Sequence, residues 1–508
     1  MTESFVEYIN VDISQDVAPN SNVNNPNSSY EYMMRYWSLI DIVSDGFESV
    51  RNNVSSVMLP IFGEGDEPYQ SRLKHLDFLP LFSRLVGLSA SMICRKAVTV
   101  VGKDDAPDAV VEQFQEHLEN IDSMGNSIDV VLESFLNLQI KYSIAGILVD
   151  APVVTENMSL ADEIALNMRP YWVAISPKDV IDWRHERRGA ALVLTHLRIR
   201  STTDIQIDEF KSKSVPIVKV YDLIDGQVLV RTFCKSKGKN GNSNWVEDAS
   251  QQVTMGLPYI PYFSMNTNAV NPFCARPTLY ELAVVNINHT RVASDLLFAL
   301  NLAAHPKLKR TRSTDFVASF EDTPAPDMAP DKVLTPGIGE DYEWLSAPDT
   351  AFSALERRIE KYEQDAEKLW TMAIMPHKNV AESEGSKKMS HNQSSSVLLK
   401  TVIALDSLLA QCVQAHFDLI DRSKVGECPP VSINVNRDLD TTGMGFDMLK
   451  TLSDLVLTHQ LSTKCLLELM VRGQVLPEDF DVEAELEELA EDPNAVEPVE
   501  PVETIGLP

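Results

Sequence analysis

The chain has 508 residues and a mass of 56.7 kDa, and its 44 Lys and Arg residues against 74 Asp and Glu residues give a formal net charge of −30. The length favours about three domain-sized units, and a hydrophobic content of 44% is too high for a wholly disordered chain. The net acidity argues against a protein that grips nucleic acid over a broad basic face, because phosphate binding needs clustered cations.

The six cysteines are scattered without a Cys-x-x-Cys pair, which disfavours a disulfide framework or a zinc ribbon and is typical of a reducing cytoplasm. Residues 1–10 lack the apolar core of a secretory signal. No apolar run approaches the ~18 residues that a membrane span needs. We therefore expect an intracellular, soluble protein with no membrane contact.

The first part of the chain reads as an arm followed by helices. Residues 16–29 are rich in Asn, Ser and Pro, which predicts a flexible N-terminal arm over 1–29. Apolar spacing then predicts helices over 30–54 and 73–86 and two more within 106–142.

The hydrophobic period changes at Ala145, and the segments up to residue 234 are rich in Val, Ile, Thr and Tyr. Asp225-Gly226 separates two such segments and predicts a β-hairpin. The middle of the chain is therefore expected to be mostly β, with a polar loop at 235–244.

A long helix is predicted over 277–303, where almost every face is apolar, so the helix must be covered on all sides. A proline-rich connector follows. The next helix, 352–372, has one narrow apolar seam with charged residues on its other faces. The seam residues follow a 3-4-3-4-3 spacing: Phe352, Leu355, Ile359, Tyr362, Ala366 and Leu369.

A polar break separates this seam helix from another predicted helix, 396–422. A short strand is expected at 431–435, followed by helices at 445–458 and 462–471. The rest of the chain, from residue 471, has a net charge of −11, and its end is expected to be disordered.

Enzyme signatures are missing from the sequence. It contains no G-x-x-x-x-G-K-[ST] phosphate loop, so ATP-driven translocation by this chain is not expected, and no H-E-x-x-H, G-x-S-x-G or G-x-G-x-x-G motif. His185 is interpreted as part of a solvated strand end, and the acidic pairs 104–105 and 487–488 as solvated faces. We expect no catalysis, no metal and no cofactor.

Two basic clusters interrupt the acidic background, and each has two interpretations. They could contact phosphates or an acidic partner, or be a helix C-terminus supplied with cations and an ordinary solvated loop. The first cluster is Lys307, Lys309, Arg310 and Arg312. The second is His377, Lys378, Lys387, Lys388 and His391.

The segment 257–295 contains three notable stretches: Leu257-Pro258-Tyr259-Ile260-Pro261, Arg276-Pro277-Thr278-Leu279 and Asn286-Ile287-Asn288-His289-Thr290-Arg291 with Ser294-Asp295. In these stretches the chain resembles the portal proteins of tailed double-stranded DNA bacteriophages. Asp182-Trp183-Arg184 upstream, Leu476-Pro477-Glu478 downstream and the order of elements over about residues 30–490 are similar too.

The resemblance implies an α+β, predominantly helical protein that forms a ring, typically of twelve subunits, at one capsid vertex of a virion. The genome is packaged and ejected through such a ring. The implied partners are further copies of the chain, the major capsid protein, the terminase packaging motor, the head–tail adaptor and double-stranded DNA in passage. The implied location is the virion, with assembly in the host cytoplasm.

The resemblance also divides the chain into named parts. These are a flexible arm (1–29), a wing with a helical and then a β-rich part (30–265), a first stem helix (266–303), a clip (304–350), a second stem helix (351–372), a tunnel loop (373–395), a helix returning to the wing (396–439), a small helical crown (440–490) and a disordered acidic tail (491–508).

Site residues follow from this division. Lys378, Lys387, Lys388 and His391 would face DNA in the tunnel loop; Lys307, Lys309, Arg310 and Arg312 would contact the motor or adaptor; Phe352, Leu355, Ile359 and Tyr362 would join neighbouring subunits.

Several alternatives remain open at this stage. The seam residues could instead pack within one subunit, and the stretch 381–386 only loosely matches the Thr/Ala/Glu-rich run of portal tunnel loops. Acidic walls would repel a duplex and let it slide. The alternatives to a portal are another virion or scaffold-type assembly protein that conducts no DNA, and an enzyme with an unrecognised metal or histidine site.

Overall fold

The computed structural model describes residues 23–103, 106–152, 168–237, 243–304, 307–312, 340–345, 349–374, 384–435 and parts of 450–491. The chain divides into two compact units, 1–437 and 438–508. Helices and strands are both abundant in the described part, which confirms the predicted α+β class. No helix in those ranges has the length and hydropathy of a membrane span.

The first unit opens with a series of helices. They are α1 (Ser28–Ser44), α2 (Phe47–Asn52), α3 (Val54–Val57), α4 (Asp66–Leu73), α5 (Leu81–Ile93), α6 (Asp108–Glu119) and α7 (Ile128–Tyr142). Helix α1 begins where it does because the side chain of Asn27 accepts a hydrogen bond from the Tyr30 backbone N–H at 2.8 Å. Its buried face is apolar and recurs every three or four residues: Tyr30, Met33, Trp37, Ile40 and Val43.

The predicted arm, 1–29, is wrong at its C-terminal end. Val23 is buried, and Arg198 Nη1 donates to its carbonyl oxygen at 2.6 Å. The Asn27 backbone N–H donates to the carbonyl of Ile181 at 3.0 Å. Residues 23–27 are therefore fixed to a β-sheet by one backbone hydrogen bond and one bond from an arginine side chain, which composition does not reveal. Residues 1–22 lie outside the described part of the chain.

The β-rich middle contains two principal sheets. A three-stranded antiparallel sheet has the order β3 (Tyr171–Ile175), β2 (Ile144–Asp150), β9 (Tyr262–Asn266), and every residue of β2 is buried. A five-stranded antiparallel meander runs through β4 (Val180–Arg188), β5 (Ala191–Asp208), β6 (Lys211–Ile224), β7 (Gln227–Lys237) and β8 (Ser243–Thr254).

The hairpin predicted at Asp225-Gly226 is confirmed, since Ile224 pairs with Gln227. Both turn residues have positive φ angles, 51° and 80°, as a type I′ turn requires. Two short pairs complete the β structure: β1 (Thr99–Gly102) with β14 (Val431–Asn434), and β10 (Ala269–Asn271) with β11 (Cys274–Ala275).

Gly146, in the centre of β2, is required by the ring of Tyr262 on the neighbouring strand. A Cβ at position 146 would lie 2.2 Å from the Tyr262 hydroxyl oxygen and 2.3 Å from the ring carbon that bears it. We expect Gly146→Ala to reduce the free energy of unfolding by about 1–3 kcal/mol, because Tyr262 is 5% exposed and cannot move aside freely. Urea unfolding measures this change.

Gly87→Ala is the matched control, since a Cβ there meets nothing within 4 Å and Gly87 lies inside helix α5. This substitution should leave stability equal or raise it by up to about 1 kcal/mol. Equal effects of the two substitutions would contradict the close approach at Gly146.

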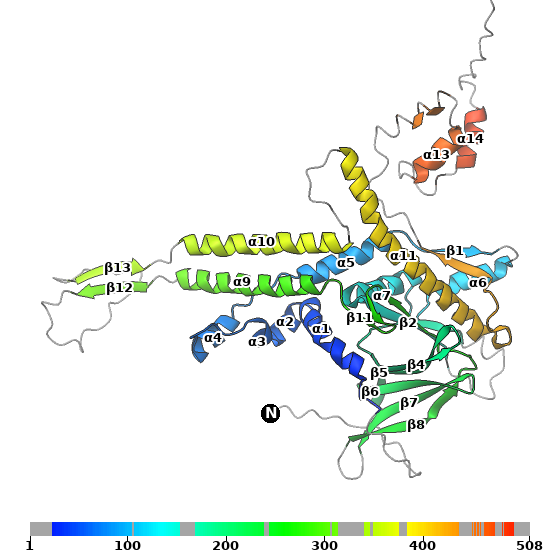
Figure 1. The fold of residues 1–508 in the computed structure, drawn as a ribbon, viewed down its shortest axis with the longest axis horizontal. Helices are drawn as coiled ribbons and strands as arrows, with labels where there is room; N and C mark the ends of the chain where they lie inside the picture. The colour runs from blue at the N-terminus through cyan, green and yellow to red at the C-terminus, as the bar shows by residue number, and fades with distance from the viewer. Residues whose placement is uncertain are drawn as a thin grey trace, which may run out of the picture. The chain divides into compact units, whose positions relative to one another are not determined.

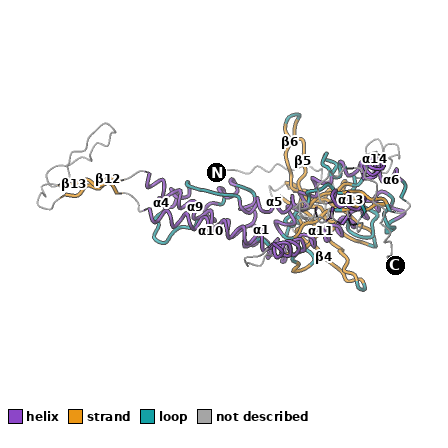
Figure 2. Tube along the Cα trace, turned by 90° about the horizontal axis from the view of Figure 1, so that it is seen from above, coloured by secondary structure: helices purple, strands orange, loops and turns teal. Residues whose placement is uncertain are grey.

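Two long helices and a β-ribbon follow. Helix α9 spans Tyr280–Ala304, strand β12 spans Lys307–Arg312, strand β13 spans Glu340–Leu345 and helix α10 spans Asp349–Ile374. Both views show α9 and α10 side by side, with the β12–β13 ribbon beyond their ends (Figures 1 and 2). Helix α11 (Glu384–Ile420) and a 3₁₀ turn, η2 (Arg422–Lys424), lead to β14.

In the second unit the described helices are α13 (Thr463–Arg472) and α14 (Val482–Glu491). Helix α13 confirms the helix predicted at 462–471. An ion pair joins the two helices, with Lys464 Nζ 2.9 Å from Glu483 Oε1. The predicted helix 445–458 and the acidic tail lie largely outside the described residues.

Candidate functional site

The helix pair α9–α10 is the candidate functional site, because it contains the predicted stem and is continuous with the predicted clip. His289 Nε2 lies 3.4 Å from Glu363 Oε1 and links the two helices. Trp370 Nε1 donates to Ser89 Oγ at 2.8 Å, which fixes α10 to α5.

The apolar seam of α10 is largely used within the chain. The positions between its predicted contact residues are mostly exposed. The contact residues themselves are half-buried: Phe352, Leu355, Ile359 and Tyr362. Because α10 lies against α9, the seam is the face that α10 turns toward α9. Arg358 covers one edge, with its guanidinium carbon 4.2 Å from the centroid of the Tyr362 ring.

Helix α9 is covered only along its first half. Leu282, Asn286 and Thr290 are at most 1% exposed, whereas Leu297 is 38% and Leu300 44% exposed. The sequence predicts that this helix is covered on all sides. Within a single chain this prediction is wrong for the end of α9 that leads to the ribbon. The uncovered leucines are an apolar surface on a helix that the sequence marks as buried.

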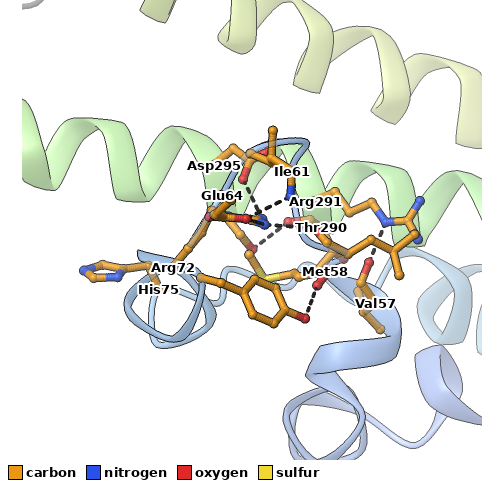
Figure 3. A network of polar contacts seen from close by, with 12 residues as sticks. Val57, Met58, Ile61, Glu64, Arg72, His75, Thr290, Arg291 and Asp295 are labelled. Carbon is orange, nitrogen blue, oxygen red and sulfur yellow. Dashed lines mark hydrogen bonds and ion pairs between the residues drawn. The ribbon is translucent and has the colours of Figure 1, made fainter. Parts of the chain in front are cut away.

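A buried arginine braces the middle of α9 against α4 (Figure 3). Arg72 is 4% exposed, and its Nε and Nη2 donate to the two carboxylate oxygens of Glu64 at 2.9 and 2.8 Å. Nη2 also donates to the carbonyl of Leu59 at 2.8 Å, and Nη1 donates to Asp295 Oδ1 on α9 at 3.3 Å. This bidentate geometry is specific to arginine.

The electrostatics of the brace follow from these contacts. Hydrogen bonds from Arg72, and then from the Ile61 backbone N–H, lower the pKa of Glu64 to about 2. Burial raises the pKa of Asp295, and Arg72 counteracts that rise. The arginine is thus the shared partner of two carboxylates.

Two neutral side chains and one arginine of α9 make further hydrogen bonds to residues 54–82. Asn286 Oδ1 accepts from the Phe82 backbone N–H and Asn286 Nδ2 donates to the Leu79 carbonyl, both at 2.9 Å. Ser294 Oγ accepts from the Asp77 N–H at 3.0 Å. Arg291 Nε donates to the Val57 carbonyl at 2.5 Å. Residues 54–82 therefore wrap α9.

These contacts give a structural role to the segment on which the resemblance depends. Asn286, Arg291, Ser294 and Asp295 were singled out in the sequence without a function, and each binds the wrapping segment 54–82. Their partners are distant in the chain, so spacing alone could not identify them.

The first basic cluster forms a strand, so its interpretation as a helix C-terminus is wrong. All four of its residues lie in β12, whose partner β13 is acidic: Glu340 faces Arg312, and Glu343 faces Lys309. Lys309 Nζ lies 3.3 Å from Glu343 Oε2. The ribbon consequently carries far less net positive charge than Lys307, Lys309, Arg310 and Arg312 suggest.

The second basic cluster is divided between the described and undescribed parts of the chain. Helix α11 already begins at Glu384, so the predicted loop 373–395 is wrong over its second half, and Lys387, Lys388 and His391 are helical. The sequence hides this because the stretch is polar and lacks an apolar stripe. Lys378 lies outside the described residues.

A row of charged side chains crosses the five-stranded sheet at the point where residues 23–27 bind. His196 Nδ1 lies 2.6 Å from Asp222 Oδ1, and His196 Nε2 lies 3.5 Å from Asp182 Oδ2. Arg198 Nη2 donates to Asp182 at 2.6 Å, and Arg231 Nη2 donates to Asp222 at 2.7 Å. Burial acts to lower the pKa of His196, but its bonds to the two carboxylates raise it above its usual value.

His196→Asn should therefore destabilise the first unit more at pH 6 than at pH 9. The stabilisation from a raised histidine pKa is fully present below the unfolded pKa of about 6.5 and is lost as pH rises through the folded pKa. We expect a loss of about 1–3 kcal/mol at pH 6. Urea unfolding at both pH values measures it, and a loss that grows with pH would contradict the bridging role.

A pair of histidines lies between α6 and α11. His117 Nδ1 lies 3.1 Å from His416 Nε2, and the His416 ring packs beside Phe114 and Trp172. Burial, and then His117, lower the pKa of His416 to about 3, and burial also lowers the pKa of His117. This pair is neutral at pH 7, so one ring donates and the other accepts.

Within the described residues, no three His, Cys, Asp or Glu side chains are grouped so that they could hold a metal ion. His185 lies on β4, half-buried, with its ring 5.0 Å from the Phe273 ring. It is a packed residue of the sheet rather than part of a solvated strand end.

No family model matches the chain, and no curated protein matches it. Among solved structures, it is similar to a chain of the virion of a native gene transfer agent particle, with 11% identity, a TM-score of 0.36 and coverage of 80% of this chain and 93% of that chain. A chain from the neck of the empty particle, computed with C6 symmetry, gives 11% identity, a TM-score of 0.38 and coverage of 80% and 92%. A chain from the neck of the native particle, computed with C12 symmetry, has 10% identity and a TM-score of 0.37, and the match covers 77% of this chain and 89% of that chain.

Proposed function

We propose that this chain is a portal-type protein that forms a ring at one capsid vertex and lets double-stranded DNA pass through its centre. The observation that carries the proposal is the helix pair of 25 and 26 residues, α9 and α10, joined through the β12–β13 ribbon. A helix pair that ends in a ribbon is suited to form the wall of a channel and to present the ribbon to a docking partner.

The surface of the pair supports assembly into a ring. Leu297 and Leu300 remain exposed on the last part of α9, where residues 296–303 are almost all apolar. Neighbouring subunits would cover these side chains, and the hydrophobic effect would then favour association. The seam of α10 contributes less to this contact than the sequence predicts, because α9 of the same chain already covers it.

The charge of the chain suits the passage of DNA. A net charge of −30 disfavours tight binding of a duplex, and scattered lysines would give only brief contacts. In this proposal Lys387 and Lys388, at the start of α11, approach the channel. The motor and the tail adaptor would dock on the ribbon, whose paired charges favour a partner with mixed charge over a purely acidic one.

Negative-stain electron microscopy of the purified protein tests the proposal. We expect rings with an axial hole on the order of 20 Å or more, since the major groove alone is about 12 Å wide. A compact monomer would overturn the proposal. Closed particles without a hole would favour the alternative, a virion or scaffold-type assembly protein that conducts no DNA.

Lys387→Glu with Lys388→Glu should reduce genome packaging or retention while ring assembly is unchanged. Glutamate has a helix propensity close to that of lysine, so α11 should remain intact, while the reversed charge repels the DNA backbone. Packaged DNA per particle and ring yield are the two measurements. If ring yield falls with packaging, these residues are structural and do not contact DNA.

A further inference from the structure

A rigid loop that exposes three large apolar side chains lies between α3 and α4. Leu59 is 57%, Ile61 56% and Phe62 fully exposed. Exposed apolar residues that are adjacent in a loop are unusual on a monomer and are typical of an interaction site. We call residues 59–62 the apolar loop.

The loop is fixed by hydrogen bonds at both of its ends. Arg72 Nη2 donates to the Leu59 carbonyl at 2.8 Å, and the Ile61 backbone N–H donates to Glu64 Oε2 at 2.9 Å. The hydroxyl of Tyr69 donates to the Met58 carbonyl at 2.9 Å. A loop held in this way loses little conformational entropy when a partner binds it.

A groove of about 300 Å³ lies between α1, α3 and α9. Its apolar lining residues are Leu39, Ile42, Val57, Val284 and Ile287, and its charged lining residues are two arginines, Arg35 and Arg291. The loop of the same chain does not occupy it, because Phe62 is fully exposed.

The charges beside the loop complement those of the groove. Asp66 and Glu67, both exposed, follow the loop in the first turn of α4, whereas the groove contains Arg35 and Arg291. Opposite charges around an apolar contact set its register and orientation.

We infer that the apolar loop of one chain binds the groove between α1, α3 and α9 of a second copy of this chain. Phe62 enters the groove, while Asp66 and Glu67 face Arg35. This inference rests on the proposed function, since it names a contact between neighbours in the ring. A head-to-tail contact of this kind leaves each subunit with one loop engaged and one groove filled, and it closes when the ring is complete.

Phe62→Ala tests the loop, with Phe210→Ala as the matched control. Both phenylalanines are highly exposed, but Phe210, at 92%, lies at the turn between β5 and β6, away from the groove. Mass photometry measures the protein concentration at which half of the chains are assembled. This concentration should rise at least tenfold for Phe62→Ala and be unchanged for Phe210→Ala. Circular dichroism checks that both variants fold.

A charge exchange tests the groove. Arg35→Glu alone should weaken assembly, and Asp66→Arg with Glu67→Arg alone should weaken it as well. The combination of all three should restore at least part of the loss, because the opposite charges meet again with exchanged positions. Assembly that is not restored would overturn the groove as the binding site of the loop.

The outcomes separate this inference from the proposed function. A wild-type chain that stays monomeric overturns the proposed function. Wild-type rings together with Phe62→Ala rings of unchanged assembly concentration overturn the loop contact and leave the ring proposal standing.

Discussion

Arg72→Ala is expected to reduce the free energy of unfolding of the first unit by about 2–4 kcal/mol. The arginine is 4% exposed and is the common partner of Glu64, Asp295 and the Leu59 carbonyl. Its removal takes the guanidinium donor away from each of these groups and opens a space where the guanidinium lay, while Glu64 keeps only the Ile61 backbone N–H. Asp295 is 38% exposed, so water can solvate its carboxylate once the arginine is gone. The expected loss of unfolding free energy is therefore smaller than for a fully buried ion pair.

Tryptophan fluorescence during urea unfolding is the appropriate measurement, since all six tryptophans lie in the first unit. Arg51→Ala is the control. Its partner Glu48 is 71% exposed and Arg51 itself 66%, so the loss there should not exceed about 0.5 kcal/mol. Arg72→Lys should recover little, because an ammonium cannot make the bidentate contact. A loss for Arg72→Ala as small as that for Arg51→Ala would refute the brace.

His416→Phe should remove much of the acid sensitivity of the first unit. The pKa of His416 is lowered to about 3 in the folded chain against about 6.5 unfolded, so below pH 6.5 the unfolded chain binds the extra proton. Stability is therefore lost as pH falls from 6.5 toward 3. At pH 5 this one side chain accounts for about 2 kcal/mol relative to pH 8.

Phenylalanine is a suitable replacement because the His416 ring already packs among the rings of Phe114, Trp172 and Phe417. The measurement is the free energy of unfolding at pH 8 and pH 5 for the wild type and the variant. His196→Asn is the internal comparison, since its effect has the opposite pH dependence. A variant whose stability falls with acid as steeply as that of the wild type would show that His416 is not the group responsible.

Local signals in the sequence predicted much of the fold. The turn at Asp225-Gly226 and the apolar helix that became α9 depend on neighbours within a few residues, and both were located from spacing and turn chemistry. The seam of α10 was also identified: its residues are half-buried in the single chain, and their contact with a neighbouring subunit stays a prediction.

The candidate site was harder to predict because its contacts join distant residues. Arg72 meets Asp295 across 223 positions, and no periodicity marks such a pair. The strand β12 was missed because a run of cations lacks apolar alternation and becomes a strand only beside the acids of β13. The helical start of α11 was missed for a related reason, since polar residues give no stripe.

The pairing of β1 with β14 has a consequence for the synthesis of the protein. Ser432 Oγ on β14 donates to the Val101 carbonyl on β1, 331 positions earlier. At a translation rate of roughly 5–20 residues per second, β1 emerges from the ribosome roughly 15–70 s before its partner strand. The edge of β1 is therefore unpaired on the nascent chain for that time, and the first unit closes only after β14, which ends at Asn434, has been made.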